Sequence, residues 1–182
     1  MLSRVEKFEA ALAQTDCDAV LVTNLKNIYY LTGFSGTEAT VFISKNRRIF
    51  LTDARYTLIA KGVVQGFDIV ETRDAIGEIV KIIADDKLQK IGFDDEISYA
   101  YFKMLESAFS AYELVPMTAF IENLRMIKDE QEIATIRKAC QISDQAFLDV
   151  LDFIKPGETT ELAVMNFLDA RMRQLGASGA SF

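Results

Sequence analysis

Residues 40–51 read Thr-Val-Phe-Ile-Ser-Lys-Asn-Arg-Arg-Ile-Phe-Leu, two short apolar runs joined by the polar segment Ser44-Lys45-Asn46-Arg47. Short runs rich in β-branched and aromatic residues, bounded by polar turn residues, are typical of buried strands. The connection between the two runs is only long enough for a turn. The stretch therefore predicts an antiparallel hairpin.

On either side of this hairpin, strands and helices alternate. Further apolar runs predict strands at residues 19–22, 67–70, 90–93 and 113–115. Capping residues that precede amphipathic stretches predict helices, and these caps are Ser3, Asp53, Asp74 and Ser98. The helix after Asp53 is expected to run from Ala54 to about Lys61 and to end at Gly62, while residues 27–33 form a short helical or irregular link. About six strands alternating with four helices predict an α/β fold with a mixed sheet flanked by helices.

The pattern changes near Leu124, which we take as the boundary between a first domain, residues 1–124, and a second segment, residues 125–182. One long helix is predicted over residues 129–153 and another over residues 161–175. Pro156 separates them because proline cannot continue a helical hydrogen-bond ladder. Both helices carry wide apolar stripes, which need a further layer of structure to bury them.

Two details of this second segment are also predictions. Arg125 and Lys128 are expected to pair with Asp129 or Glu130 at the start of the long helix. The small-residue stretch from Gly176 to Phe182 is expected to lead into another strand. The sequence thus predicts that this chain is the N-terminal part of a larger enzyme and not a complete enzyme.

Composition excludes several functions. The net charge of −7 argues against binding to nucleic acid or to an anionic membrane. No apolar run approaches the roughly 20 residues of a membrane helix, and the first residues do not form a signal peptide. Cys17 and Cys140 have neither metal nor redox spacing, so we expect two reduced, buried thiols in a cytoplasmic protein.

Chemistry based on histidine is excluded because the sequence contains none. This rules out Ser-His-Asp and Cys-His nucleophiles and zinc sites built on histidine. No phosphate-binding glycine motif occurs either. The acidic pair Asp85-Asp86 and the acidic triplet Asp94-Asp95-Glu96 offer carboxylates for a metal ion, but such clusters more often cap helices or face solvent.

Five segments, taken in order, resemble the prolidase, aminopeptidase P and creatinase family, with the overall pattern closest to bacterial Xaa-Pro dipeptidases. Residues 27–34 are similar to its N-x-x-Y-L-T-G-F segment, and residues 52–56 to its T-D-x-R-Y segment. Residues 124–133 resemble the bridge into its catalytic domain. Residues 155–161 and 176–182 resemble the opening turns of that domain.

The resemblance implies an N-terminal α/β domain followed by two helices that begin a pita-bread α+β catalytic domain. In that catalytic domain two divalent metals, usually Mn, Co or Zn, are held by two Asp, one His and two Glu, all of which would lie beyond Phe182. The resemblance therefore implies no metal ligand and no catalytic residue in this chain. It implies a non-catalytic portion of a proline-specific metallopeptidase that shapes the substrate cleft and supports a homodimer. Its partners would be the missing catalytic domain and, in the parent protein, proline-containing peptides.

The candidate contacts with the substrate cleft or a second subunit are Phe34, Glu38, Asp53, Arg55 and Tyr56. Simpler structural roles compete with this interpretation. Asp53 can cap a helix, Arg55 can pair with a carboxylate to fix a turn, and residues 34–38 can form an ordinary surface loop. The alternative function is a stand-alone α/β interaction or dimerisation module without peptidase activity.

Overall fold

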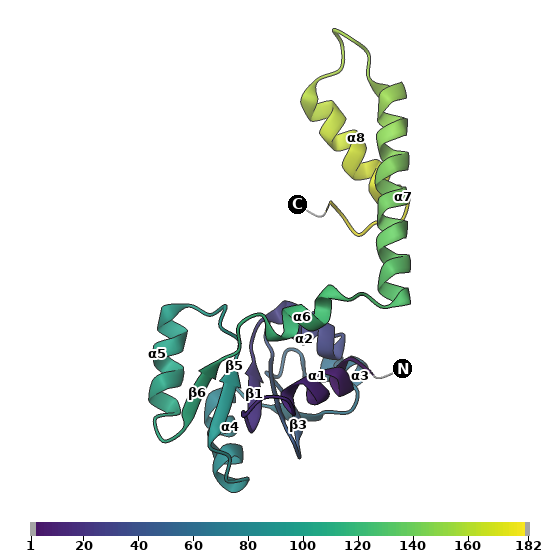
Figure 1. Cartoon of the computed structure of the whole chain (residues 1–182). Coiled ribbons are helices and arrows are strands. Elements are labelled where there is room, and N and C mark those ends of the chain that lie inside the picture. Colours follow the sequence, from purple (N-terminus) through teal and green to yellow (C-terminus); the bar gives the residue numbers. More distant parts are fainter. Residues whose placement is uncertain (1–2, 181–182) are drawn as a thin grey trace. The chain divides into compact units, whose positions relative to one another are not determined.

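The computed structural model describes residues 3–180 (Figure 1). The chain divides into two compact units, Met1–Ile127 and Lys128–Phe182. The domain boundary predicted at Leu124 stays a prediction. Ser181 and Phe182, the end of the segment expected to lead into another strand, lie outside the described residues. Among the described residues, no helix is long and apolar enough to cross a membrane.

The first unit contains a six-stranded sheet in the order β4-β3-β2-β1-β5-β6. The strands are β1 (Ala19–Val22), β2 (Thr40–Ser44), β3 (Arg48–Thr52), β4 (Asp68–Glu71), β5 (Lys90–Phe93) and β6 (Glu113–Pro116). The predicted hairpin is confirmed, since β2 pairs antiparallel with β3 and with β1, while the remaining neighbours are parallel. The sheet is therefore mixed, as predicted.

Helices cover both faces of this sheet (Figure 1). They are α1 (Arg4–Leu12), α2 (Leu25–Thr32), α3 (Thr57–Val63), α4 (Ala75–Asp85), α5 (Tyr99–Ala108) and α6 (Phe120–Met126). Successive residues of β1 point to opposite faces, as the pleat requires. Val20 packs with residues of α1, α2, α3 and α6, whereas Leu21 packs with residues of α4 and α5.

The predicted helix after Asp53 is wrong at both ends. The helix α3 begins at Thr57, no side chain caps it, and Gly62 lies inside it. The Asp53 carboxylate instead accepts a hydrogen bond from the backbone N–H of Arg55, two residues on. Asp53 therefore closes a local turn, an arrangement that competes with helix capping.

The helix α6 was not predicted at all. It has seven residues, its N-terminal Ala119 supplies no side-chain hydrogen bond, and the φ angle of Ala119 is +54°. None of the usual capping signals is therefore present. Arg125 lies within α6 and bonds to Asn27 and Glu122, while its predicted pairing with Asp129 or Glu130 stays a prediction.

The second unit consists of α7 (Glu130–Phe153) and α8 (Glu161–Gln174), close to the predicted bounds. Within it the rings of Phe153 and Phe167 stack at 4.4 Å, and Arg171 forms an ion pair with Asp149. Only Ala146 and Val150 of α7 are buried, and α8 has no buried residue. The prediction that both cysteines are buried is wrong for Cys140, which is exposed on α7.

The left-handed backbone conformation of Lys87, just after α4, can be tested by mutation. Its φ angle is +56°, and its N–H and that of Leu88 bond to the carbonyls of Ala84 and Ile83. This is the Schellman arrangement, whose left-handed position normally holds glycine. We expect Lys87→Gly to raise the free energy of unfolding by about 0.5–1 kcal/mol in urea denaturation.

Ala84→Gly is the matched control, since Ala84 is exposed in the same helix but has ordinary helical geometry. That variant should lose about 1 kcal/mol of stability. A loss of stability in both variants would contradict the assigned conformation of Lys87.

Candidate functional site

The predicted site residues gather at one edge of the sheet because β2 runs against its neighbours. Asp53 directly follows β3, at its carboxyl end, while Glu38 lies just before β2, whose start is at the same edge. Glu38, Asp53 and Arg55 line a pocket of about 410 Å³ together with Thr72 and Arg73, which follow the parallel strand β4. Ligand sites of open α/β sheets characteristically lie at the carboxyl ends of the strands.

An ion pair between Asp53 and Arg55 stiffens this edge. The guanidinium of Arg55 donates from Nε and Nη2 to Oδ2 of Asp53, at 2.9 and 2.7 Å, and its backbone N–H donates to Oδ1. These hydrogen bonds lower the pKa of Asp53, while the carboxylate raises the pKa of Arg55. The Arg55 side chain is two-thirds exposed, so its outer surface stays open to a partner.

Tyr56 connects this ion pair to the loop before β2. Its hydroxyl shares a hydrogen bond of 2.8 Å with Oγ1 of Thr37, and its ring meets the ring of Phe34 edge-on at 5.7 Å. The guanidinium of Arg55 lies over the Tyr56 ring, at 5.4 Å from its centre. Tyr56 thus holds the two loops of the pocket edge to each other.

Phe34, one of the candidate contacts, does not face outward. It is buried, with its ring edge-on to Phe50 at 5.0 Å. A Cβ on Gly36 would collide with the Phe34 ring, so the loop can fold back over that ring only with glycine there. Phe34 therefore anchors the loop that carries the exposed Glu38.

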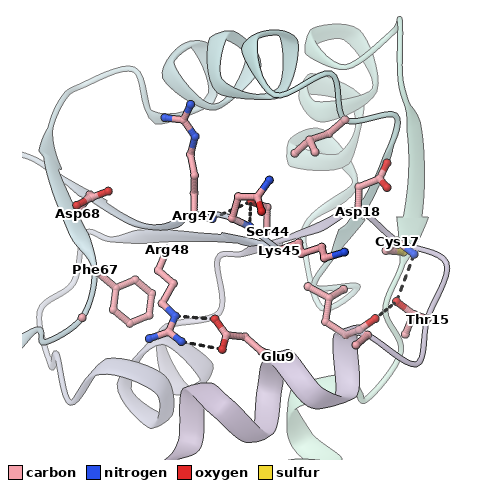
Figure 2. A pocket seen from close by; sticks show the side chains of 15 residues that line it. Glu9, Thr15, Cys17, Asp18, Ser44, Lys45, Arg47, Arg48, Phe67 and Asp68 are labelled. Carbon is pink, nitrogen blue, oxygen red and sulfur yellow. Dashed lines mark hydrogen bonds and ion pairs between the residues drawn. The ribbon is translucent and has the colours of Figure 1, made fainter.

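A larger pocket of about 930 Å³ lies at the opposite edge of the sheet, where β1, β3 and β4 begin (Figure 2). Its two arginines bond to carboxylates of the same chain. Arg48 binds Glu9 through two hydrogen bonds of 2.6 and 2.7 Å, and Arg47 binds Asp86 in the same bidentate way. None of the predicted site residues lies in this pocket.

The acidic clusters take structural roles. Asp86 pairs with Arg47, as just described, whereas Asp94 is buried and its Oδ2 accepts the backbone N–H groups of Thr23 and Asn24. Burial raises the pKa of Asp94. Among residues 3–180, no three His, Cys, Asp or Glu side chains are placed to hold a metal ion. The described residues therefore offer no donor set for a pair of metals, whose ligands the resemblance assigns to positions beyond Phe182.

Sequence reasoning missed the polar residues that surround Asp94. Asn27 is buried and bonds to Asp94 and to Glu122 of α6, which also lies near Arg125. The one available signal was the helical phase of Asn27, which shares a face with Tyr30 and Leu31. That phase indicates a buried polar side chain but not its partners.

Comparison with known proteins gives a consistent result. Residues 4–127 match the Creatinase/Prolidase N-terminal domain family. The uncharacterized peptidase YqhT of Bacillus subtilis is 36% identical over 98% of this chain, and the match covers 51% of that protein. The chain thus spans about half the length of this curated relative.

Two solved structures extend the comparison. The Xaa-Pro dipeptidase from Bacillus anthracis matches with a TM-score of 0.90 and 35% identity, over 98% of this chain and 50% of that one. The aminopeptidase P from Streptococcus thermophilus matches with a TM-score of 0.65 and 57% identity, over 67% of this chain and 95% of that one. The first match takes in the helices of both units.

The ion pair at the pocket edge can be tested by titration. Arg55 lowers the pKa of Asp53 in the folded chain. The pair therefore stabilises the fold at pH values above about 3.9, the pKa of aspartate in the unfolded chain. This stabilisation is lost as the pH falls through the pKa that Asp53 has in the folded chain. We expect Arg55→Ala to raise the pKa of Asp53 toward its ordinary value, measured by carbon-detected NMR of the carboxyl groups.

Arg47→Ala is the matched control because it removes another arginine–aspartate ion pair, at the opposite edge of the sheet. It should leave the titration of Asp53 unchanged. An Asp53 titration that is the same in wild type and Arg55→Ala would contradict the assigned ion pair.

Proposed function

Because the chain belongs to the creatinase/prolidase N-terminal domain family, we propose that it is the non-catalytic N-terminal portion of an Xaa-Pro dipeptidase or aminopeptidase. The observation that carries this proposal is the match to about half the length of such proteins, including the dipeptidase from Bacillus anthracis. In the proposal, residues 125–182 form the link to a catalytic domain and its first two helices. The metal ions that activate water for peptide hydrolysis belong to that domain.

The proposed role of the first unit is to shape the substrate cleft and to support a homodimer. The pocket edge at Glu38, Asp53 and Arg55 suits such a contact because it combines a rigid base with exposed charged groups. The Asp53–Arg55 pair and the Tyr56–Thr37 hydrogen bond fix the two loops. A pre-ordered surface of this kind loses little entropy when it meets a substrate or a second subunit. A cytoplasmic location of the parent protein is part of the same proposal.

A stand-alone interaction module is the second candidate, and the exposed apolar side chains of the second unit favour it. The large apolar residues that are more than half exposed there are Phe147, Leu148, Leu151, Leu162 and Met165. Exposed apolar surface of this kind marks either a protein contact or a surface that another part of the same protein covers. The peptidase proposal assigns it to the second role.

The decisive experiment is to express the gene to its native stop codon and to assay hydrolysis of Xaa-Pro dipeptides with Mn²⁺, Co²⁺ or Zn²⁺. We expect the complete protein to be active and residues 1–182 alone to be inactive under the same conditions. A native stop directly after Phe182, or hydrolysis by pure residues 1–182, would overturn the proposal. The first of these results would leave the interaction module as the leading function.

The pocket edge is tested in the complete protein. We expect Arg55→Ala to lower kcat/KM for an Xaa-Pro dipeptide by about tenfold, because a fixed charged contact with the cleft or the second subunit is lost. Arg47→Ala removes a comparable ion pair at the opposite edge and should leave kcat/KM unchanged. Equal losses in the two variants would indicate a stability effect and not a role of this edge in the reaction.

A further inference from the structure

The helix α6 cannot be stable on its own. A helix of seven residues is far shorter than the roughly 12–15 residues that an isolated helix needs. Its N-terminus lacks a side-chain cap, and Ala119 adopts the left-handed conformation, which is unfavourable for a residue with a Cβ. The position of α6 must therefore be set by contacts with the rest of the first unit.

Apolar contacts hold one side of α6. Ile121 is buried in the same cluster as the residues of α1 and α2. The ring of Phe120 meets the ring of Phe8 edge-on at 5.3 Å. Such contacts favour burial but are not strongly directional, so they do not fix how the helix is rotated about its axis.

A polar cluster on another side of α6 provides the directional hydrogen bonds that fix the rotation of the helix about its axis. Asn27 of α2 is only 1% exposed. Its amide nitrogen donates to Oε1 of Glu122 at 2.8 Å and to Oδ1 of Asp94 at 3.2 Å. Its amide oxygen accepts from Nη1 of Arg125 at 2.9 Å. The side chain of Asn27 thus connects α2, the loop after β5, and two positions of α6.

The hydrogen-bonding pattern leaves one orientation for this amide. A carboxylate only accepts and a guanidinium only donates, so the nitrogen must face Asp94 and Glu122, and the oxygen must face Arg125. A rotation of the amide by 180° would place its oxygen against two carboxylates. An isosteric aspartate at position 27 would do the same and would add a negative charge.

We propose that Asn27 is a positioning residue that locks α6 onto the first unit and so fixes where the chain leaves that unit at Ile127. The lock depends on a neutral amide with both donor and acceptor groups. Glu122 lies in the first turn of α6 and Arg125 in its last turn, so their attachment to Asn27 restrains the helix at both ends, up to the junction. This inference concerns the first unit alone and goes beyond the peptidase proposal.

Hydrogen–deuterium exchange of residues 1–182 tests the lock directly. In Asn27→Asp at neutral pH, we expect the amides of residues 123–127 to exchange about tenfold faster or more, because α6 opens locally. In Asn27→Ala the effect should be smaller, since no extra charge faces Asp94 and Glu122. Arg125→Ala, at a position that is about one-third exposed and that folding tolerates more easily, should also accelerate exchange in this segment.

The pH dependence separates the lock from a general packing defect. The charged groups around Asn27 are Asp94, Glu122 and Arg125, with Glu96 farther along the loop after β5. Repulsion by the two bonded carboxylates would raise the pKa of an aspartate at position 27. Protection of α6 in Asn27→Asp should therefore recover relative to wild type as the pH is lowered from 7.5 toward 5.

Two controls make the result specific. Asn123→Asp is the same chemical change on an exposed position of α6, and it should leave exchange of residues 123–127 near the wild-type rate. Ile83→Val weakens the core on the other face of the sheet without touching the cluster, and it should not single out α6. Wild-type exchange of α6 in both Asn27→Asp and Arg125→Ala would overturn the inference.

The outcome is independent of the peptidase proposal. Exchange in α6 reports on the first unit whether or not the complete protein hydrolyses a dipeptide. An inactive complete protein with a released α6 in Asn27→Asp would reject the peptidase proposal and keep the lock. An active complete protein, together with unchanged exchange of α6 in Asn27→Asp and Arg125→Ala, would keep the peptidase proposal and reject the lock.

Discussion

The fold of the first unit depends on burial of both faces of its sheet. The central strands β1 and β2 are buried at every position, and their apolar side chains alternate between two clusters that also contain residues of the helices. Full burial of one valine, leucine, isoleucine or phenylalanine contributes roughly 1.5–3 kcal/mol. This requirement forces helices onto both faces, and it explains why one cluster contains α1, α2, α3 and α6 while the other contains α4 and α5.

The antiparallel direction of β2 determines which segments meet at the candidate site. In a fully parallel sheet, the segment that precedes a strand lies at the amino edge, away from the carboxyl ends of its neighbours. Because β2 is reversed, the loop with Glu38 lies beside the turn with Asp53 and Arg55. One reversed strand therefore brings together two segments that the family resemblance had singled out separately.

Polar contacts complete what burial leaves open. The apolar clusters determine which helices cover the sheet, but the directional bonds of Asn27, Asp94 and Arg125 specify how α2, β5 and α6 meet. The burial of Asp94 is compensated by two backbone N–H groups and an amide, as a buried carboxylate requires. In the second unit polar contacts such as the Arg171–Asp149 ion pair join the helices, but only two residues of the two helices are buried.

The sequence by itself determined the local elements and the family, because capping boxes, turn residues and apolar runs act over a few neighbouring positions. It predicted the hairpin, the caps at Ser3 and Asp74, and both helices of the second unit. Only the tertiary structure decided the burial of Phe34, the exposure of Cys140 and the role of Asp53. It alone revealed the cluster around Asn27, whose partners Asp94, Glu122 and Arg125 lie 67, 95 and 98 residues away in the chain. The helical phase of Asn27 indicates that its side chain is buried, but no periodic or local signal identifies its partners, since these contacts arise only when the packed sheet brings distant segments within hydrogen-bonding distance.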